Sequence, residues 1–238
     1  MDKKDVIMLY SDFEGTILRE SDGNYDDMEM YNFLKQLSKL QELTGAKVKM
    51  HIVSPISKND MSKKLERLDK NFMNFNRLQK DSLAKLNLIE GAAASPSEEF
   101  FRKGEADFLH EVYMRRVDSR IVDLKKPTDQ NSKNPAAFGK ANYVRSWTEL
   151  MKTTNNVKMV IYCGNGRNDL DAMSYVTRQK GGFVICPKNS RHEAKAMAQC
   201  VSEKTDLPGI TDGIAKINRM LEQKSDPGKN LTDNNEQR

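Results

Sequence analysis

The sequence predicts an α/β protein with a doubly wound parallel sheet, and three observations predict it. The first half opens with an apolar strand-like run, a stretch with helical spacing and a second strand-like run. The second half, from about residue 139, alternates in the same way. Polar and acidic residues follow several of the strand-like runs. Strands that alternate with helices are typical of a parallel sheet with helical crossovers.

The first strand–helix–strand unit lies near the beginning of the chain. Residues 6–10 form an apolar run fit for a buried strand, and residues 27–44 carry apolar side chains three and four positions apart before Gly45. In the segment AKVKMHIVSPIS, apolar positions alternate before a break at Ser54 and Pro55, which predicts a second strand.

The middle of the chain has a different composition. Residues 58–135 are dense in Lys, Asn and Met, and amphipathic helical patches occur around 60–88 and 98–116. The only strand-like run there is SRIVDL, and residues 127–135 have the composition of a polar loop. We interpret residues 58–135 as a mostly helical insert in the α/β domain.

The second half returns to the α/β alternation, and the chain then ends in a polar tail. The expected core domain therefore comprises residues 1–57 and 136–223, and residues 224–238 have too little to bury and are expected to be disordered. The elements expected in the second half are helix 139–152, strand 157–163, a helix after Asn168, strand 182–187, helix 190–199 and helix 212–223.

Composition narrows the class of protein. The 238 residues carry 39 basic and 34 acidic side chains, and both signs are mixed along the chain, which argues against a nucleic-acid surface and suits small anionic ligands. No run approaches the roughly 20 apolar residues of a membrane span, and no signal segment follows the first residues. Three cysteines without a CxxC pair are interpreted as buried thiols rather than redox or metal groups. We expect a cytoplasmic protein, with no nucleic-acid or membrane partner.

Side chains suited to phosphate and metal follow three of the predicted strands. Asp12, Glu14, Gly15 and Thr16 come after the first, and Ser54 closes the second. The run GNGRNDLDAM, residues 164–173, follows a later one. Ligands of parallel α/β sheets bind beyond the carboxyl ends of the strands, and clustered oxygen ligands suit Mg2+.

These residues, with Lys140 at the start of a predicted helix, resemble the four motifs of the haloacid dehalogenase superfamily, in order. The segments GKANYVRSWTELM, CPKNSRHEAKAMAQCVS and ITDGIAKINRML resemble the C-terminal half of its Cof-like sugar-phosphate phosphatases. The match covers roughly residues 6–57 and 137–222, and the insert resembles no cap of the family. In that superfamily a segment at this place forms a cap that selects the substrate.

The resemblance implies a role for each motif residue. Asp12 would be the nucleophile that forms an aspartyl-phosphate, and Glu14 would protonate the leaving oxygen and later activate water. Lys140 would neutralise charge at Asp12 and the phosphate. The substrate-binding residues would be Gly15, Thr16, Ser54, Pro55 and Asn168. The ligands of Mg2+ would be Asp12, Glu14, Asn165 and Asp169.

Two positions depart from the Cof-like pattern, which has Asp where this chain has Glu14 and Asn165. The longer Glu side chain could cost about 100-fold in rate by misplacing a proton, although the enolase-phosphatases resemble this chain in having Glu there. The Asn165 amide brings no charge, so metal affinity should fall unless Asp169 or Asp171 compensates. Asp171 is interpreted as an exposed helix residue, and His51 as a packed or exposed histidine rather than a catalyst.

The resemblance thus implies Mg2+-dependent hydrolysis of a small phosphate monoester, such as a sugar phosphate, through an Asp12 phospho-enzyme. The alternative is a catalytically weakened protein of the same fold that acts as a phosphoryl-ligand binding or interaction module. A nucleic-acid 3′-phosphatase is a minor third hypothesis, because the mixed charges of the insert speak against it. The sequence leaves the substrate and the oligomeric state open.

Overall fold

The computed structural model describes residues 3–54, 56, 58–81, 84–94, 121–123 and 135–225. Within these ranges seven strands form one sheet in the order β4-β3-β2-β1-β5-β6-β7, and every neighbouring pair is parallel. The strands are β1 (Lys4–Ser11), β2 (Lys47–Ser54), β3 (Gly91–Ala94), β4 (Ile121–Asp123), β5 (Asn155–Cys163), β6 (Gly182–Cys186) and β7 (Cys200–Val201). The predicted doubly wound α/β fold is confirmed.

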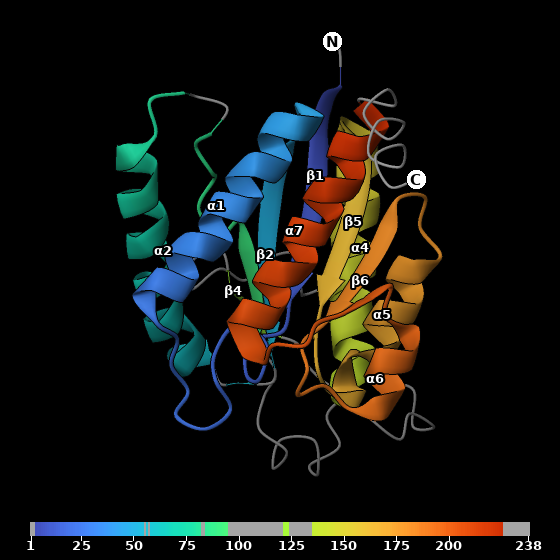
Figure 1. Ribbon diagram of the computed structural model, residues 1–238. Coiled ribbons are helices and arrows are strands. Elements are labelled where there is room, and N and C mark those ends of the chain that lie inside the picture. The colour runs from blue at the N-terminus through green and yellow to red at the C-terminus, as the bar shows by residue number, and fades with distance from the viewer. Residues whose placement is uncertain are drawn as a thin grey trace, which may run out of the picture.

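Helices cover both faces of the sheet (Figure 1). Helices α1, α2 and α7 pack with the sheet into one hydrophobic cluster, and α4, α5 and α6 pack into a second cluster on the opposite face. The helices are α1 (Asp27–Thr44), α2 (Lys58–Leu78), α4 (Pro135–Thr154), α5 (Leu170–Thr177), α6 (His192–Met197) and α7 (Asp206–Ser225), with a 3₁₀ turn, η1 (Arg167–Asp169), before α5.

Strand β1 lies at the centre of the sheet because it is apolar on both faces. Ile7 and Leu9 point into the first cluster, whereas Met8 and Tyr10 point into the second. A strand that is buried on both faces reads as a continuous apolar run, which is the pattern seen in the sequence. Its carboxyl end delivers Asp12 to the edge of the sheet between the ends of β2 and β5.

Helix α1 has the predicted bounds, and its ends explain them. The Asp26 side chain accepts from the backbone N–H groups of Met28 and Glu29, and the Glu29 side chain accepts from the Asp26 backbone N–H in a capping box. Gly45 ends the helix in the left-handed region, at φ 66°. Local sequence signals therefore set both ends of this helix.

Elements of the second half occur in the predicted order, with some different bounds. Helix α7 begins at Asp206 rather than near residue 212, and it includes Pro208 in its first turn, where the missing N–H costs nothing. Strand β7, which was not predicted, has only two residues and so shows no periodicity. Helix α7 extends to Ser225, and the rest of the expected tail lies outside the described residues.

The structure departs from the expected insert over residues 58–94. Helix α2 packs in the same hydrophobic cluster as α1, and β3 and β4 extend the central sheet beyond β2. The amphipathic pattern around residues 60–88 predicted a helix, but it did not show which core the apolar stripe of α2 joins. This stripe consists of Met61, Leu65, Leu68, Phe72 and Phe75. The run SRIVDL does supply a strand, β4. Residues 95–120 and 124–134, which include the expected helical patch 98–116, lie outside the described residues.

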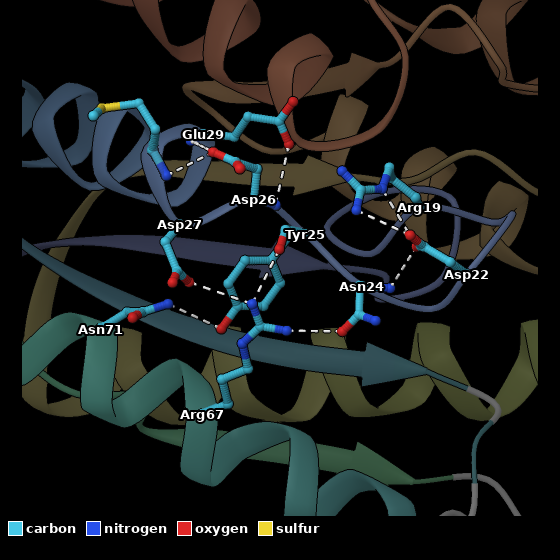
Figure 2. Close-up of polar contacts among 10 residues, drawn as sticks. Arg19, Asp22, Asn24, Tyr25, Asp26, Asp27, Glu29, Arg67 and Asn71 are labelled. Atoms are coloured by element: carbon cyan, nitrogen blue, oxygen red, sulfur yellow. Dashed lines mark hydrogen bonds and ion pairs between the residues drawn. The ribbon is translucent and has the colours of Figure 1, made fainter.

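Helix α2 also holds the segment that leads from β1 to α1 (Figure 2). Arg67 donates to the Asn24 side chain at 2.8 Å and to the Tyr25 backbone carbonyl at 3.1 Å, and its guanidinium lies 4.2 Å from the Tyr25 ring centroid. The Asn71 side chain donates to the Tyr25 hydroxyl at 3.0 Å. The loop that follows Asp12 is therefore fixed from the side of α2.

Candidate active site

A pocket of about 660 Å³ opens beyond the carboxyl ends of the strands. Four residues predicted from the sequence line it, namely Asp12, Glu14, Asn165 and Asn168. The other lining residues are Glu20, Gly166, Arg167, Asn189 and Arg191. A volume in this range suits a small metabolite. The pocket therefore lies beyond the carboxyl ends of the strands, where ligands of parallel α/β sheets bind.

Lys140 lies beneath the pocket and joins two of the predicted acids. Its ammonium nitrogen is 3.0 Å from Asp12 Oδ1 and 2.7 Å from Asp169 Oδ1. The Lys140 side chain is 1% exposed, so this contact is shielded from water. Helix α4 carries Lys140 to this place because its apolar face packs on β1 and β5 in the second cluster. A lysine and two carboxylates thus form one buried charged group.

Asp169 is saturated with hydrogen-bond donors. Its Oδ1 accepts from Lys140 and from the Tyr162 hydroxyl at 2.8 Å. Its Oδ2 accepts from the backbone N–H groups of Asn165 at 3.0 Å and Gly166 at 2.9 Å. A carboxylate has about four acceptor sites, and these four donors use them. The predicted role of Asp169 as a metal ligand is therefore not what this geometry favours; Asp169 holds Lys140 and the 164–166 turn.

Asp12 keeps one carboxylate oxygen for the pocket. Its Oδ1 accepts from the Phe13 backbone N–H at 2.7 Å and faces Lys140. Its Oδ2 has no protein partner within the described part of the chain. Because Asp12 lines the pocket, this second oxygen is the one available to a ligand or a reacting group.

Burial and charge act together on the acids and Lys140. Burial raises the pKa of Asp12 to about 7; the Lys140 ammonium opposes the rise and the Asp169 carboxylate adds to it. For Lys140, burial disfavours the charged form, but Asp12 and Asp169 outweigh it and raise the pKa of the ammonium above its usual value. Lys140 therefore stays positively charged beneath the pocket.

Two buried hydroxyls, one in the loop after β1 and one at the end of β2, lack a hydrogen-bond partner. Thr16 Oγ1 and Ser54 Oγ are both buried, and neither makes a hydrogen bond within the described residues. Buried hydroxyls are normally hydrogen-bonded, so an unpaired pair near a pocket needs a reason. Both follow strands that end beside Asp12, and a phosphoryl oxygen is an acceptor that would satisfy them.

Gly15 allows the loop after β1 to approach the 164–166 turn closely. It has φ 67°, and an added Cβ would clash with the side-chain amide of Asn165. The Asn189 side chain donates to the Gly15 carbonyl at 3.0 Å and to Asp206 at 3.0 Å. The Asn165 amide therefore lies against the loop that carries Asp12 and Glu14.

Glu14 lies at the mouth of the pocket rather than beneath it. Its side chain is 52% exposed, and its carboxylate is 3.5 Å from the Lys64 ammonium of α2. Glu14 is thus placed differently from Asp12, which is buried.

Sequence reasoning missed several residues of the site. Tyr162 sits in β5 with an ordinary strand pattern, so nothing in the sequence marked its hydroxyl as a partner of Asp169. Asn189 and Arg191 follow β6, so they could have been predicted from the same tendency of ligands to bind beyond the carboxyl ends of parallel strands. Glu20 comes from the loop between β1 and α1, whose course depends on the fold, and Arg167 opens η1 within the run 164–173.

The remaining predicted residues fall in several places. Pro55 lies outside the described residues. Asp171 is exposed in the first turn of α5, as interpreted from the sequence. His51 is buried, and its Nδ1 lies 2.9 Å from the Tyr143 hydroxyl. Its packed position agrees with the non-catalytic interpretation.

The donors fit a divalent cation only in part. Asp12 Oδ2 and the Asn165 amide face the pocket, and Glu14 lies on its wall. Asp12 offers one buried charged oxygen without a protein partner, and Glu14, of which one oxygen faces Lys64, is 52% exposed. Both oxygens of Asp169 already accept hydrogen bonds. Within the described ranges, no group of three or more His, Cys, Asp or Glu side chains is placed to hold a metal ion. These donors alone are too few for a complete Mg2+ coordination shell.

No family model matches the chain, and no curated protein matches it. Among the residues that the structure describes, no helix is long and apolar enough to cross a membrane.

Solved structures with a similar course of the chain are distant. A 3-deoxy-D-manno-octulosonate 8-phosphate phosphatase from Moraxella catarrhalis, in complex with magnesium, phosphate and KDO, has 13% identity, covers 93% of this chain and 92% of its own, and has a TM-score of 0.44. The corresponding phosphatase from Yersinia pestis has 10% identity, coverage of 92% and 83%, and a TM-score of 0.45. A haloacid dehalogenase-like hydrolase protein from Bacillus subtilis has 16% identity, coverage of 91% and 90%, and a TM-score of 0.48. At these scores the similarities carry no conclusion about activity.

Proposed function

We propose that this chain is a phosphomonoester hydrolase of the haloacid dehalogenase type, with Asp12 as the nucleophile. The observation that supports this most strongly is Asp12 itself: one of its carboxylate oxygens lies at the pocket without a partner, and the other lies 3.0 Å from the buried Lys140 ammonium. Two unpaired buried hydroxyls, Thr16 after β1 and Ser54 at the end of β2, add to it. Phosphoryl transfer requires this combination of a nucleophile with hydrogen-bond donors and positive charge.

In the first half-reaction, Asp12 Oδ2 attacks the phosphorus of the substrate. A bond forms between that oxygen and phosphorus, and the bond from phosphorus to the leaving oxygen breaks. Thr16 and Ser54 donate hydrogen bonds to the phosphoryl oxygens, and Lys140 neutralises the charge that builds up near Asp12. Glu14, which lies at the mouth where the leaving group would depart, gives its proton to the leaving oxygen.

In the second half-reaction, Glu14 takes a proton from a water molecule, and the water oxygen attacks the phosphorus of the aspartyl-phosphate. The bond to Asp12 breaks, and inorganic phosphate and the free carboxylate result. Mg2+, held by Asp12 and Asn165 with Glu14 nearby, would supply further positive charge at the phosphoryl group. The substrate that we propose is a small phosphorylated metabolite such as a sugar phosphate, because the pocket has room for one.

The proposal is tested by hydrolysis of an aryl phosphate with Mg2+ or with EDTA. Asp12→Asn should abolish turnover, because it removes the attacking carboxylate, whereas Asp171→Asn removes an exposed carboxylate of α5 and should leave turnover unchanged. Mass spectrometry of the native chain, quenched in acid during turnover, should detect an added phosphoryl group that is absent in Asp12→Asn. Equal turnover in the native chain and in Asp12→Asn would contradict the proposal.

A second candidate function is supported by Asn165 and Asp169. The Asn165 amide brings no charge to the pocket, and both carboxylate oxygens of Asp169 already accept hydrogen bonds. The chain could therefore bind a phosphoryl ligand without hydrolysing it. A protein that only binds its ligand would be stabilised against unfolding by phosphate, and it would not hydrolyse the aryl phosphate with any metal ion. Hydrolysis that depends on Asp12 excludes it.

A further inference from the structure

We propose that Asn189 is a positioning residue of this site. With Asp206 as its partner, it fixes the Gly15 carbonyl in the loop after β1. That loop also carries Glu14 and Thr16, so the same contact places both side chains. The hydrogen bonds of Asn189 and Asp206, here called the brace, stand on geometry alone, whereas the kinetic consequence of the brace rests on the proposed function.

The loop after β1 needs a contact from outside to hold its shape. Gly15 has φ 67°, and glycine is the residue with the widest choice of backbone conformations. Within the loop, the Gly15 N–H donates to the Leu18 carbonyl at 2.8 Å. The Gly15 carbonyl accepts from the Asn189 side chain at 3.0 Å, and it has no other hydrogen-bond donor among the described residues. The orientation of this peptide group therefore depends on Asn189.

Asp206 fixes the plane of the Asn189 amide. Asn189 Nδ2 donates to Asp206 Oδ1 at 3.0 Å, and Asn189 Oδ1 accepts from the Asp206 backbone N–H at 3.1 Å. An amide nitrogen has two hydrogens, so the second one is directed at the Gly15 carbonyl. Asp206 is buried, and it is the one non-glycine residue with positive φ, 48°, in the part of the chain that the structure describes. The chain thus keeps an unfavourable backbone conformation at the residue that orients Asn189.

The turn that carries Asn189 is itself held on two sides. The Arg191 N–H donates to the Asn165 carbonyl at 2.8 Å, which ties this turn to the turn after β5. On the other side, Gly209 in the first turn of α7 lies so close to Pro187 that an added Cβ would clash. Asn189 therefore reaches Gly15 from a fixed base, and it can hold the loop in one place.

The brace matters for the proposed reaction because Gly15 lies between Glu14 and Thr16. Helix α2 holds the far part of this loop at Asn24 and Tyr25, whereas Asn189 holds the part next to the pocket. A displacement of about 1 Å in a reacting group can lower a rate about 100-fold. Without Asn189, proton transfer by Glu14 to the leaving oxygen should therefore become less efficient.

Hydrogen exchange of the full chain tests the brace without any substrate. In Asn189→Ala, the amides of residues 15–18 should exchange about three- to tenfold faster than in the native chain, because the loop loses a hydrogen bond. Lys188→Ala, an exposed neighbour in the same turn, should leave this exchange unchanged. Circular dichroism checks that both variants fold.

Two substitutions of Asp206 separate the hydrogen bond from the backbone conformation. Asp206→Asn keeps a side-chain oxygen for the Asn189 N–H and tolerates positive φ, so exchange of residues 15–18 should stay near the native rate. Asp206→Gly tolerates the same φ but removes the acceptor. It should raise this exchange, although less than Asn189→Ala does, because the bond to Gly15 remains.

The kinetic test compares 4-nitrophenyl phosphate with phenyl phosphate. The nitrophenolate leaves readily without a proton, whereas the phenolate needs one from Glu14. Asn189→Ala should therefore lower kcat/KM for phenyl phosphate about threefold more than for 4-nitrophenyl phosphate. A general loss of folded protein would lower both values by the same factor. Lys188→Ala should retain the native kcat/KM for both esters, and Asp206→Asn should remain close to it.

Unchanged exchange of residues 15–18 in Asn189→Ala would overturn the inference, and so would an equal rise in Lys188→Ala. Equal losses of kcat/KM for the two esters would overturn it as well, because they would separate the brace from Glu14. Failure of the proposed function looks different. The native chain would then hydrolyse neither ester, while exchange would still rise in Asn189→Ala and stay native in Asp206→Asn, and the brace would stand.

Discussion

At the scale of single residues, Asp169 holds together several parts of the site through hydrogen bonds. It accepts from a side-chain ammonium, a phenol hydroxyl and two backbone N–H groups, the last two from residues that line the pocket. The sequence identified the residue but not this role, because the role depends on Tyr162 from β5 and on the turn at 164–166. Hydrogen-bond saturation is a property of the folded arrangement, and residue spacing does not encode it.

Asp169→Asn should lower the free energy of unfolding by about 3–5 kcal/mol, because the change removes one partner of a buried charged group. The side-chain N–H groups of the new Asn would face hydrogen-bond donors from which the Asp169 carboxylate accepts in the native chain. Urea unfolding followed by circular dichroism measures the change. Asp171→Asn, two residues away and exposed, should stay within about 0.5 kcal/mol of the native chain. Equal effects of the two substitutions would show that the Asp169 carboxylate is not an anchor.

His51 is a buried base that the proposed reaction does not use. Burial and, to a smaller extent, the charge of Lys49 lower its pKa to about 3, so the folded chain keeps the ring neutral. A neutral ring with its proton on Nε2 accepts the Tyr143 O–H at Nδ1. The hydrogen bond joins β2 to α4 one turn after Lys140, so it helps to place that lysine.

The contribution of His51 to the stability of the chain should therefore decrease as the pH falls. Below about 6.5 the unfolded chain takes a proton on this ring that the folded chain refuses until about 3. Asp12, whose pKa is raised, contributes in the opposite direction, so the effect of His51 is read by comparison with a variant. The loss is at most about 1.4 kcal/mol per pH unit. His51→Gln keeps an acceptor for Tyr143 but does not titrate, and its unfolding free energy between pH 6.5 and 4.5 should decline less steeply. Parallel curves for both proteins would contradict this.

At the scale of elements, helix α2 links the core to the site. It was predicted as part of a separate insert because Lys and Asn crowd its outer face, yet its apolar stripe packs against α1. Lys64 faces Glu14, and Arg67 binds the segment of Asn24 and Tyr25 one turn later. Periodicity predicted the helix correctly, but a pattern of spacing does not say which core a stripe joins.

Arg67→Ala should loosen the loop between β1 and α1. The change removes hydrogen bonds to Asn24 and Tyr25 and the contact over the Tyr25 ring, and we expect a loss of about 1–2 kcal/mol in the free energy of unfolding. Lys70→Ala, on the same helix, breaks only an exposed pair with Glu66 and should cost less than about 0.5 kcal/mol. Hydrogen exchange of the loop amides should rise in the first variant alone. Unchanged exchange would show that α2 does not hold the loop.

At the scale of the whole molecule, the site forms because the strands are parallel. Asp12, Ser54 and the 164–166 turn are far apart in the sequence, but β1, β2 and β5 are neighbours and end at the same edge. This convergence was predictable from alternating strands and helices. The extension of the sheet was not: the run SRIVDL predicted the strand β4 but not its place in this sheet, and β3 and β7 are too short to show a strand pattern.

The three cysteines have a practical consequence of their own. All are free; Cys163 and Cys186 have no exposed surface, and Cys200 has 5%. Burial also raises the pKa of the Cys186 thiol to about 12, so the reactive thiolate is scarce as well as hidden. An alkylating reagent can therefore reach these sulfurs only when the core on either face of β5 and β6 opens. The rate of labelling therefore measures how often the core opens. This measurement requires no substrate and no knowledge of what the pocket binds.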